Sequence, residues 1–301
     1  MRVQFLAWAL SVSLTSCAGP GVEHLVVQMD WTHEAEYTGF YAAEAQGYFR
    51  QAGVAVTLVE GPPGTDVPAA LGTGRADAAQ MGLVMYQSAA QTDPDLVAVF
   101  ATLQTSPRVI LTLANRGVKS PRDLEGLTVG VKSPSWGALV RKVMANAGAD
   151  PSRIREVPVK TSDIARFYTG EISVWTGFAT GEPVEAALAG HPVNQLFADD
   201  YGAGGYDELI VVRRSALEKA PDAYYRLIAA LVKGWTWAAD HGDDVPALLD
   251  RWQPAAGHLS HELAWKALRP LVITGKDPVG WIRNDRWPGI GTFSMKLLDQ
   301  P

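Results

Sequence analysis

Aromatic side chains follow the first apolar run of the chain and could form a binding site for a flat ligand. Trp31, Tyr37 and Tyr41 come shortly after residues 25–29, which have the length and composition of a buried strand. Aromatic rings stack on planar ligands and contribute roughly 0.5–1.5 kcal/mol per pair beyond burial. Ligands of open α/β sheets bind outside the carboxyl ends of strands, which is where these rings are expected.

Five further residues are candidates for ligand contact, and several of them have a structural alternative. The turn around Gly64 could offer backbone donors to a phosphate, or it could serve only as a turn. Trp136 could stack on the ligand or begin a helix, and Glu182, just before a proline, could bind a ligand amide or cap a helix. In the same way, Trp31 and Tyr37 could fill a core. The five candidates are Gly64, Gln104, Trp136, Glu182 and Tyr201.

Catalytic and metal-binding patterns are absent from the sequence. The six histidines are scattered, and His33 is the one that lies in the first loop. No HExxH, GxSxG or phosphate-binding glycine motif occurs, so the sequence predicts no catalytic residue, no metal site and no cofactor. Cys17 is the single cysteine, which excludes an internal disulfide and disfavours a cysteine-based metal site.

The N-terminus has the pattern of an export signal. A basic residue at position 2 precedes an apolar stretch, and residues 14–17 end it with Leu-Thr-Ser-Cys. This pattern resembles a bacterial lipobox, which implies a signal peptide over residues 1–16, diacylation of Cys17 and a short tether over residues 17–23. Two acyl chains anchor a protein stably, so we expect an extracytoplasmic protein on the bacterial cell membrane. The alternative is a signal without lipidation and an incidental cysteine.

Composition narrows the class of protein further. The chain has 301 residues, 47% hydrophobic and 19% charged, with a formal net charge of -6. These values are typical of a folded globular protein. No run of five basic residues occurs, which argues against nucleic-acid binding. Beyond the N-terminus, no apolar stretch is long enough to span a bilayer.

Apolar strand-like runs alternate with helical patterns along most of the chain, which predicts an α/β fold with a mostly parallel sheet. Similar strand-helix-strand patterns begin near Leu25 and Leu127, so we expect two lobes. The first lobe is predicted over residues 24–113 and 207–301, and the second over residues 114–206. The carboxyl ends of both sets of strands would then face a common cleft.

An ordered series of short motifs gives the chain a family resemblance. It resembles the solute-binding proteins that share their fold with the thiamine pyrimidine precursor synthase. The resemblance covers roughly residues 25–250 and implies a two-lobed periplasmic-binding-protein fold of type II, a monomer that delivers its ligand to an ABC permease and its ATPase. The motifs are Asp30-Trp31-Thr32, Gly39-Phe40-Tyr41, Gly47-Tyr48-Phe49, Gly74-Arg75-Ala76-Asp77, Ser106-Pro107, Gly181-Glu182-Pro183 and Asp200-Tyr201-Gly202.

The same resemblance leaves the ligand open. Family members bind aromatic heterocycles such as formylaminopyrimidine or riboflavin, and others bind sulfonates, taurine or nitrate. The aromatic residues favour a heterocycle, with riboflavin or a thiamine pyrimidine precursor as the expected ligand. Two other classes are a synthase-like enzyme and a sensory input domain. The synthase uses a cysteine-rich iron motif, which a chain whose only cysteine is Cys17 cannot form.

Overall fold

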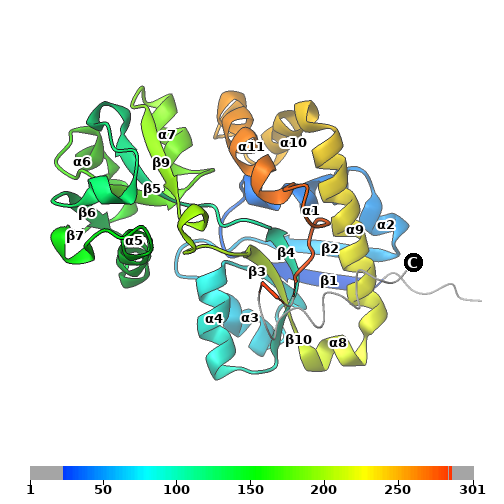
Figure 1. The fold of residues 1–301 in the computed structure, drawn as a ribbon. Helices are drawn as coiled ribbons and strands as arrows, with labels where there is room; N and C mark the ends of the chain where they lie inside the picture. The colour runs from blue at the N-terminus through cyan, green and yellow to red at the C-terminus, as the bar shows by residue number, and fades with distance from the viewer. Residues whose placement is uncertain (1–22, 284, 287–301) are drawn as a thin grey trace, which may run out of the picture.

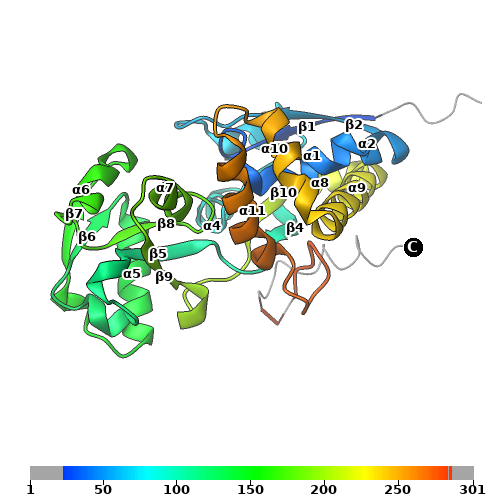
Figure 2. The same ribbon diagram turned by 90° about the horizontal axis from the view of Figure 1, so that it is seen from above.

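Two α/β lobes, joined by two crossing segments, organise the chain (Figures 1 and 2). The computed structural model describes residues 23–283, 285 and 286. The expected signal peptide, Cys17 and nearly all of the tether lie outside the described residues. Among the described residues, no helix combines the length and the hydropathy that a membrane span requires.

The first lobe is built on a five-stranded sheet in the order β2-β1-β3-β10-β4. β1 pairs in parallel with β2 and β3, whereas β10 is antiparallel to both β3 and β4. All eight residues of β4 are buried, as expected for an apolar run covered on both faces. The strands are β1 Glu23–Gln28, β2 Val54–Val59, β3 Ala78–Met81, β4 Leu96–Leu103 and β10 Asp207–Arg213.

Helices cover both faces of this sheet (Figure 1). α9 crosses α1 at a point where two glycines let the backbones approach: a β-carbon on Gly234 would lie 2.1 Å from the carbonyl oxygen of Gly39. The helices are α1 Thr38–Ala45, α2 Tyr48–Gln51, α3 Val67–Gly72, α4 Leu83–Thr92, α8 Arg214–Lys219, α9 Pro221–Asp240, α10 Val245–Trp252 and α11 His258–Val272, with 3-10 turns η1 Ala35–Tyr37 and η7 Gly242–Asp244.

The second lobe contains a three-stranded sheet, β8-β5-β9, and a parallel pair, β6-β7. A bridge between Val129 and Val174 joins the pair to the sheet. The elements are β5 Arg108–Leu113, β6 Thr128–Val131, β7 Arg155–Pro158, β8 Trp175–Phe178, β9 Val193–Phe197, α5 Pro134–Asn146, α6 Ala165–Tyr168 and α7 Glu182–Leu188, with η2 Ala114–Arg116, η3 Pro121–Leu124, η4 Pro151–Arg153, η5 Thr161–Ile164 and η6 Asp199–Tyr201.

One expected boundary differs from the structure. The sequence predicts β5 at the end of the first lobe, with the crossing near Ala114. The structure instead pairs β5 with β8 and β9 in the second sheet, so the first crossing occupies residues 104–107. β4 and β5 are both apolar runs, so their composition does not show which sheet each one joins. Their hydrogen-bond partners decide this, and those partners are distant in the sequence. The chain returns to the first sheet between Phe197 and Asp207.

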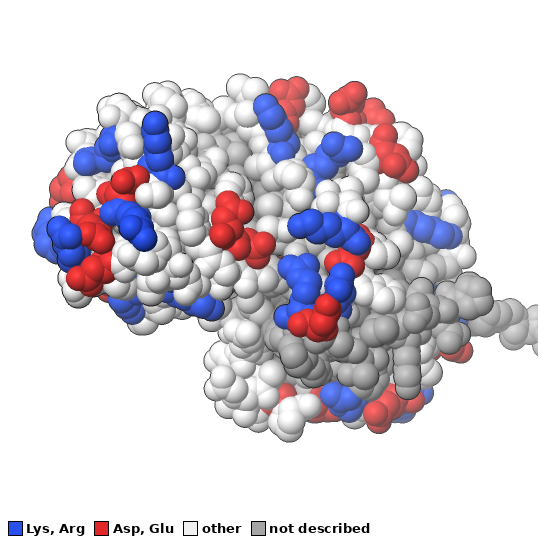
Figure 3. All heavy atoms as spheres, in the orientation of Figure 1, with Lys and Arg blue, Asp and Glu red and all other residues white. Residues whose placement is uncertain are grey.

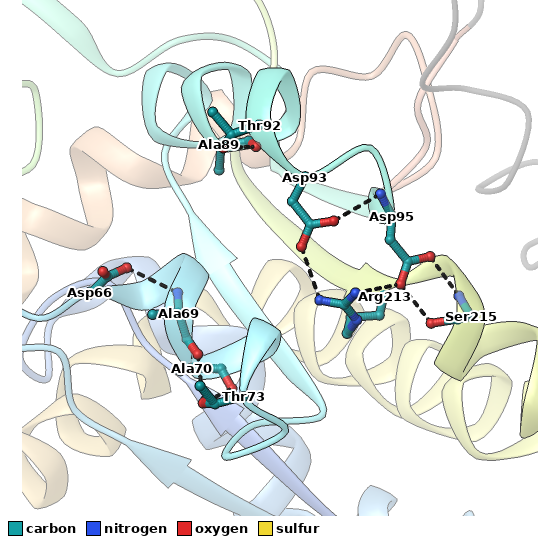
Figure 4. Close-up of polar contacts among 10 residues, drawn as sticks. All are labelled: Asp66, Ala69, Ala70, Thr73, Ala89, Thr92, Asp93, Asp95, Arg213 and Ser215. Carbon is teal, nitrogen blue, oxygen red and sulfur yellow. Dashed lines mark hydrogen bonds and ion pairs between the residues drawn. The ribbon is translucent and has the colours of Figure 1, made fainter.

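The far end of β10 is held to the first lobe by a network of polar contacts (Figure 4). Arg213 donates to Asp93 at 3.0 Å and contacts Asp95 at 2.9 Å, and Asp95 also accepts from Ser215. Nearby, Asp66 caps α3 by accepting from the backbone N–H of Ala69 at 3.0 Å. These contacts secure the return strand at the end opposite the crossing.

Candidate ligand cleft

The carboxyl ends of the first-lobe strands face the second lobe, and two polar contacts cross between the lobes there. Arg108, the first residue of β5, donates to Asp207, the first residue of β10, at 3.3 Å. Thr180, after β8, donates to the carboxylate of Glu36 in η1. α7 also contacts α11 across the same gap. The two sheets therefore meet at the edge where an α/β fold places its ligand.

Two carboxylates of the protein occupy the N-terminus of α4 at this edge. Asp30 accepts from the backbone N–H of Gly82 at 2.9 Å, and Asp207 accepts from that of Leu83 at 2.5 Å. A helix N-terminus attracts anions because its free N–H groups and its dipole favour negative charge. At α4 two of those donors, the N–H groups of Gly82 and Leu83, are already bound by side chains of the chain itself.

Four carboxyl groups at the cleft edge have raised pKa values, because burial disfavours the charged form. Burial raises the pKa of Asp30 to about 6, against the opposing hydrogen bonds from Tyr37 and Gly82. Burial, reinforced by neighbouring carboxylates, also raises the pKa of Glu34 and of Glu208. The pKa of Glu36 is raised by burial against the hydrogen bond from Thr180. This edge of the first lobe thus carries four acidic groups that resist ionisation.

This acidity is local. On the face seen in Figure 3, acidic and basic side chains are interspersed over both lobes. Among the described residues, no group of three or more histidine, cysteine, aspartate or glutamate side chains could hold a metal ion. The carboxylates at the cleft edge are therefore not arranged as metal ligands.

The second lobe contributes a cation and aromatic cluster to the edge. Trp136, in the first turn of α5, packs edge-on against Phe178 with ring centroids 5.7 Å apart. Arg108 and Lys132 lie over the Trp136 ring, at 5.4 and 5.0 Å from its centroid. Glu182 pairs with Lys132 and accepts from the backbone N–H of Phe178. Both cations therefore have a carboxylate partner, since Arg108 pairs with Asp207.

Trp31 and Tyr37 differ in exposure. The Tyr37 hydroxyl donates to Asp30 at 2.9 Å and accepts from the backbone N–H of Trp31 at 2.9 Å. The Tyr37 ring itself is fully buried, so it holds the loop from within. Trp31 is 44% exposed, with its backbone held by Tyr37 and by the N–H of Gly61. The Trp31 side chain is therefore partly exposed, while its backbone is hydrogen-bonded at both its N–H and its carbonyl group.

The four other expected contact residues differ in burial and in partners. Tyr41 is fully buried and stacks on Trp252, with ring centroids 4.5 Å apart. Gln104 is fully buried, and its amide donates to the carbonyls of Ala101 and Trp281. Tyr201 packs on the core of the second lobe. Gly64 is exposed in the β2–α3 loop, with φ 95°. Tyr41 and Gln104 are thus buried within the first lobe, although Tyr41 lies 6.4 Å from the Tyr37 ring between centroids.

Several residues of the edge were not among the expected contacts: Glu36, Arg108, Lys132, Thr180, Asp207 and Glu208. A signal for three of them exists in the sequence, because Arg108, Asp207 and Glu208 each stand at the start of an otherwise apolar run. A charged residue next to an apolar run indicates the end of a buried strand, where the side chain can reach polar partners. Glu36 and Thr180 carry no such signal, because they meet only through tertiary structure.

Comparison with known proteins identifies the fold and the family. The architecture is that of two-lobed periplasmic binding proteins: the structure superposes with a TM-score of 0.65 on the periplasmic aliphatic sulphonate binding protein SsuA from Escherichia coli, over 81% of this chain and 79% of that one, at 22% identity. The model of the NMT1/THI5 like family matches residues 34–245, and the chain belongs to this family. This confirms the expected fold class and resemblance.

Two curated relatives align over most of the chain. A formylaminopyrimidine-binding protein from Halalkalibacterium halodurans is 26% identical over 273 residues, which are 88% of this chain and 82% of the relative. A putative thiamine biosynthesis protein from Haemophilus influenzae is 23% identical over 262 residues, covering 83% of this chain and 80% of the relative.

Proposed function

We propose that this chain is an extracytoplasmic solute-binding protein of an ABC importer, and that its ligand is a small nitrogen heterocycle bearing an amino group, such as a pyrimidine precursor of thiamine. The family and the fold support the binding role. The relative named for formylaminopyrimidine supports the ligand class. Diacylation of Cys17 would keep the protein at the membrane beside its permease, and it would act as a monomer.

The observation that carries the ligand class is the occupation of the α4 N-terminus by Asp30 and Asp207. A sulfonate or nitrate needs free donors, and here two carboxylates bind the N–H groups of Gly82 and Leu83. An anion would also meet the half-buried carboxyl group of Glu34 and the buried carboxyl group of Glu208 nearby. A heterocycle with N–H donors instead finds hydrogen-bond acceptors at the same place.

The aromatic groups fit the same class of ligand. Trp136 and Phe178 lie on the second-lobe side of the edge, and Trp31 projects beside Asp30 on the first-lobe side. A planar ring placed between them would stack on aromatic faces while its polar rim meets the carboxylates. Specificity would come from the polar rim, and much of the affinity from stacking.

The mechanism follows from the two crossings. Short segments before β5 and before β10 are the only covalent connections between the lobes in the described part of the chain, so rotation about them would open and close the cleft. In the closed form the Thr180–Glu36 hydrogen bond and the Arg108–Asp207 ion pair join the lobes. Ligand that bridges the lobes would favour this form because it contacts both at once. The permease would then receive the closed complex.

Binding assays on purified residues 18–301 test the proposal. Isothermal titration calorimetry and thermal unfolding would be run with formylaminopyrimidine, riboflavin, taurine and nitrate. We expect saturable binding and a raised unfolding temperature with formylaminopyrimidine alone. Binding of riboflavin would place the chain with flavin carriers. Binding of taurine or nitrate without any heterocycle would refute the ligand class. Turnover of formylaminopyrimidine, followed by mass spectrometry, would instead support a synthase-like enzyme.

A further inference from the structure

Three carboxylate oxygens converge beside the α-carbon of Gly82. A β-carbon at this glycine would lie 3.5 Å from Asp207 Oδ1, 3.8 Å from Glu208 Oε1 and 3.9 Å from Asp30 Oδ2. Asp30 and Asp207 use these same oxygens to accept backbone N–H groups at the start of α4. The hydrogen bond that Glu208 receives from a side chain is made by its other oxygen, Oε2. Glu208 therefore presents Oε1 to the space beside Gly82.

Gln80 positions Glu208 and adds an unsatisfied acceptor to the cluster. The Gln80 side chain is fully buried, and its Nε2 donates to Glu208 Oε2 at 3.0 Å. Its own Oε1 has no hydrogen-bond partner within the described part of the chain. A buried amide oxygen without a donor is costly. The cluster thus contains acceptors in excess of the donors that the protein supplies.

The backbone of Glu208 is also unusual. Its φ of 49° is the only positive value among the described residues other than glycine, and such a conformation is uncommon for a side chain of this type. Residues in sparsely populated conformations concentrate at functional sites. Glu208 is the second residue of β10, directly after the chain returns from the second lobe.

We propose that Glu208, positioned by Gln80, is the specificity-determining residue of the cleft and binds the amino-bearing edge of a nitrogen heterocycle in the space beside Gly82. This inference rests on the proposed function. An aminopyrimidine edge presents an amino N–H beside a ring nitrogen. Oε1 of Glu208, the oxygen that faces this space, accepts a hydrogen bond from the amino group, while Oε2 stays bound to Gln80.

Two variants test this assignment in different ways. Glu208→Met removes the acceptor. Gly82→Ala fills the space with a methyl group whose nearest neighbours would be 3.5–3.9 Å away, and the φ of -59° at Gly82 suits alanine, so this variant should fold. Glu262→Met is the matched control, since that carboxylate lies on α11 with its side chain 52% exposed. Unfolding temperatures would show whether each variant is folded. If Glu208→Met does not fold, the binding measured for Gly82→Ala tests the proposal instead.

Calorimetry would use formylaminopyrimidine and its analogue with a methyl group in place of the ring amino group. We expect Glu208→Met and Gly82→Ala to bind formylaminopyrimidine at least about tenfold more weakly than wild type, and Glu262→Met to bind it unchanged. The methyl analogue should bind wild type weakly, and Glu208→Met should not weaken it further. The loss is thereby tied to the amino group.

The outcomes separate this inference from the function on which it rests. If wild type binds formylaminopyrimidine and Glu208→Met binds it equally well, the role of Glu208 is refuted while the proposed function stands. If Gly82→Ala weakens binding of formylaminopyrimidine and Glu208→Met does not, the ligand occupies the space beside Gly82 but the role of Glu208 is refuted. If wild type binds a sulfonate and no aminopyrimidine, the proposed function fails first.

Discussion

Thr180 of the second lobe donates a hydrogen bond to the buried carboxylate of Glu36 in the first lobe, although 144 positions separate them in the sequence. Both side chains are less than one-tenth exposed. A polar contact that excludes water is stronger than one at a surface. This pair therefore joins the lobes through a water-excluded contact between the segment after β8 and η1, here called the latch.

Removing the latch should favour the open form. Thr180→Val keeps the shape of the side chain but deletes the donor, and it leaves the Glu36 carboxyl group without its partner. We expect a larger radius of gyration in small-angle X-ray scattering without ligand, and affinity lowered by roughly fivefold to tenfold. Thr169→Val is the control, because Thr169 bonds only within its own lobe, to the carbonyl of Arg166. Identical scattering for both variants would contradict the latch.

Stability should fall as pH rises through the titration of Asp30. Its pKa is raised from 3.8 to about 6, so the folded state holds a proton that the unfolded state releases earlier. The stabilising contribution is complete below pH 3.8 and is lost as pH rises toward about 6. The pKa values of Glu34, Glu36 and Glu208 are also raised by burial, so these groups change stability in the same direction as pH rises. Urea unfolding at a series of pH values measures this.

Two variants identify which carboxyl group causes the decrease in stability with rising pH. Asp30→Asn should flatten the decrease in the free energy of unfolding between pH 4 and about 6. Asp123→Asn should leave that decrease unchanged, because hydrogen bonds from Lys119 and Ser120 lower the pKa of Asp123, which therefore titrates below this range. A decrease that persists in Asp30→Asn would assign it to other groups.

Trp31 and Trp265 should differ in what their loss affects. Trp31 is 44% exposed at the cleft edge, and Trp265 is 5% exposed between helices. Trp31→Ala should weaken ligand binding about tenfold or more with little change in stability, since it removes a stacking surface. Trp265→Ala should lower the free energy of unfolding by about 3–5 kcal/mol through the cavity it leaves. Equal losses of affinity, measured by calorimetry, would show that Trp31 does not contact the ligand.

The lipid anchor can be tested in cells. Cys17→Ala removes the acylated residue, so the protein should move from the membrane to the soluble fraction while its unfolding temperature stays the same. Fractionation followed by immunoblotting measures the distribution. Ser16→Ala is the control, because alanine is also a small residue before the cysteine. Retention of Cys17→Ala at the membrane would refute lipidation as the tether.

The family and the fold class were readable from local patterns. Strand-like runs such as residues 25–29 and 96–103 depend on composition over a few residues, and so do the turns and helix caps around them. The motif Asp30-Trp31 marked the first loop of the cleft for the same reason. Aromatic type alone could not separate Trp31, which projects from its loop, from Tyr41, which stacks on Trp252 inside the lobe.

Only the tertiary structure decided which residues meet. β5 joins the second sheet because β8 and β9, more than 60 residues later in the sequence, supply its hydrogen-bond partners. Gly82, Asp30 and Glu208 come from three segments that converge at one sheet edge. Composition and spacing determined the elements of this protein, since those depend on neighbours along the chain. The cleft chemistry depends on distances between remote carboxylates, and these exist only after the chain folds.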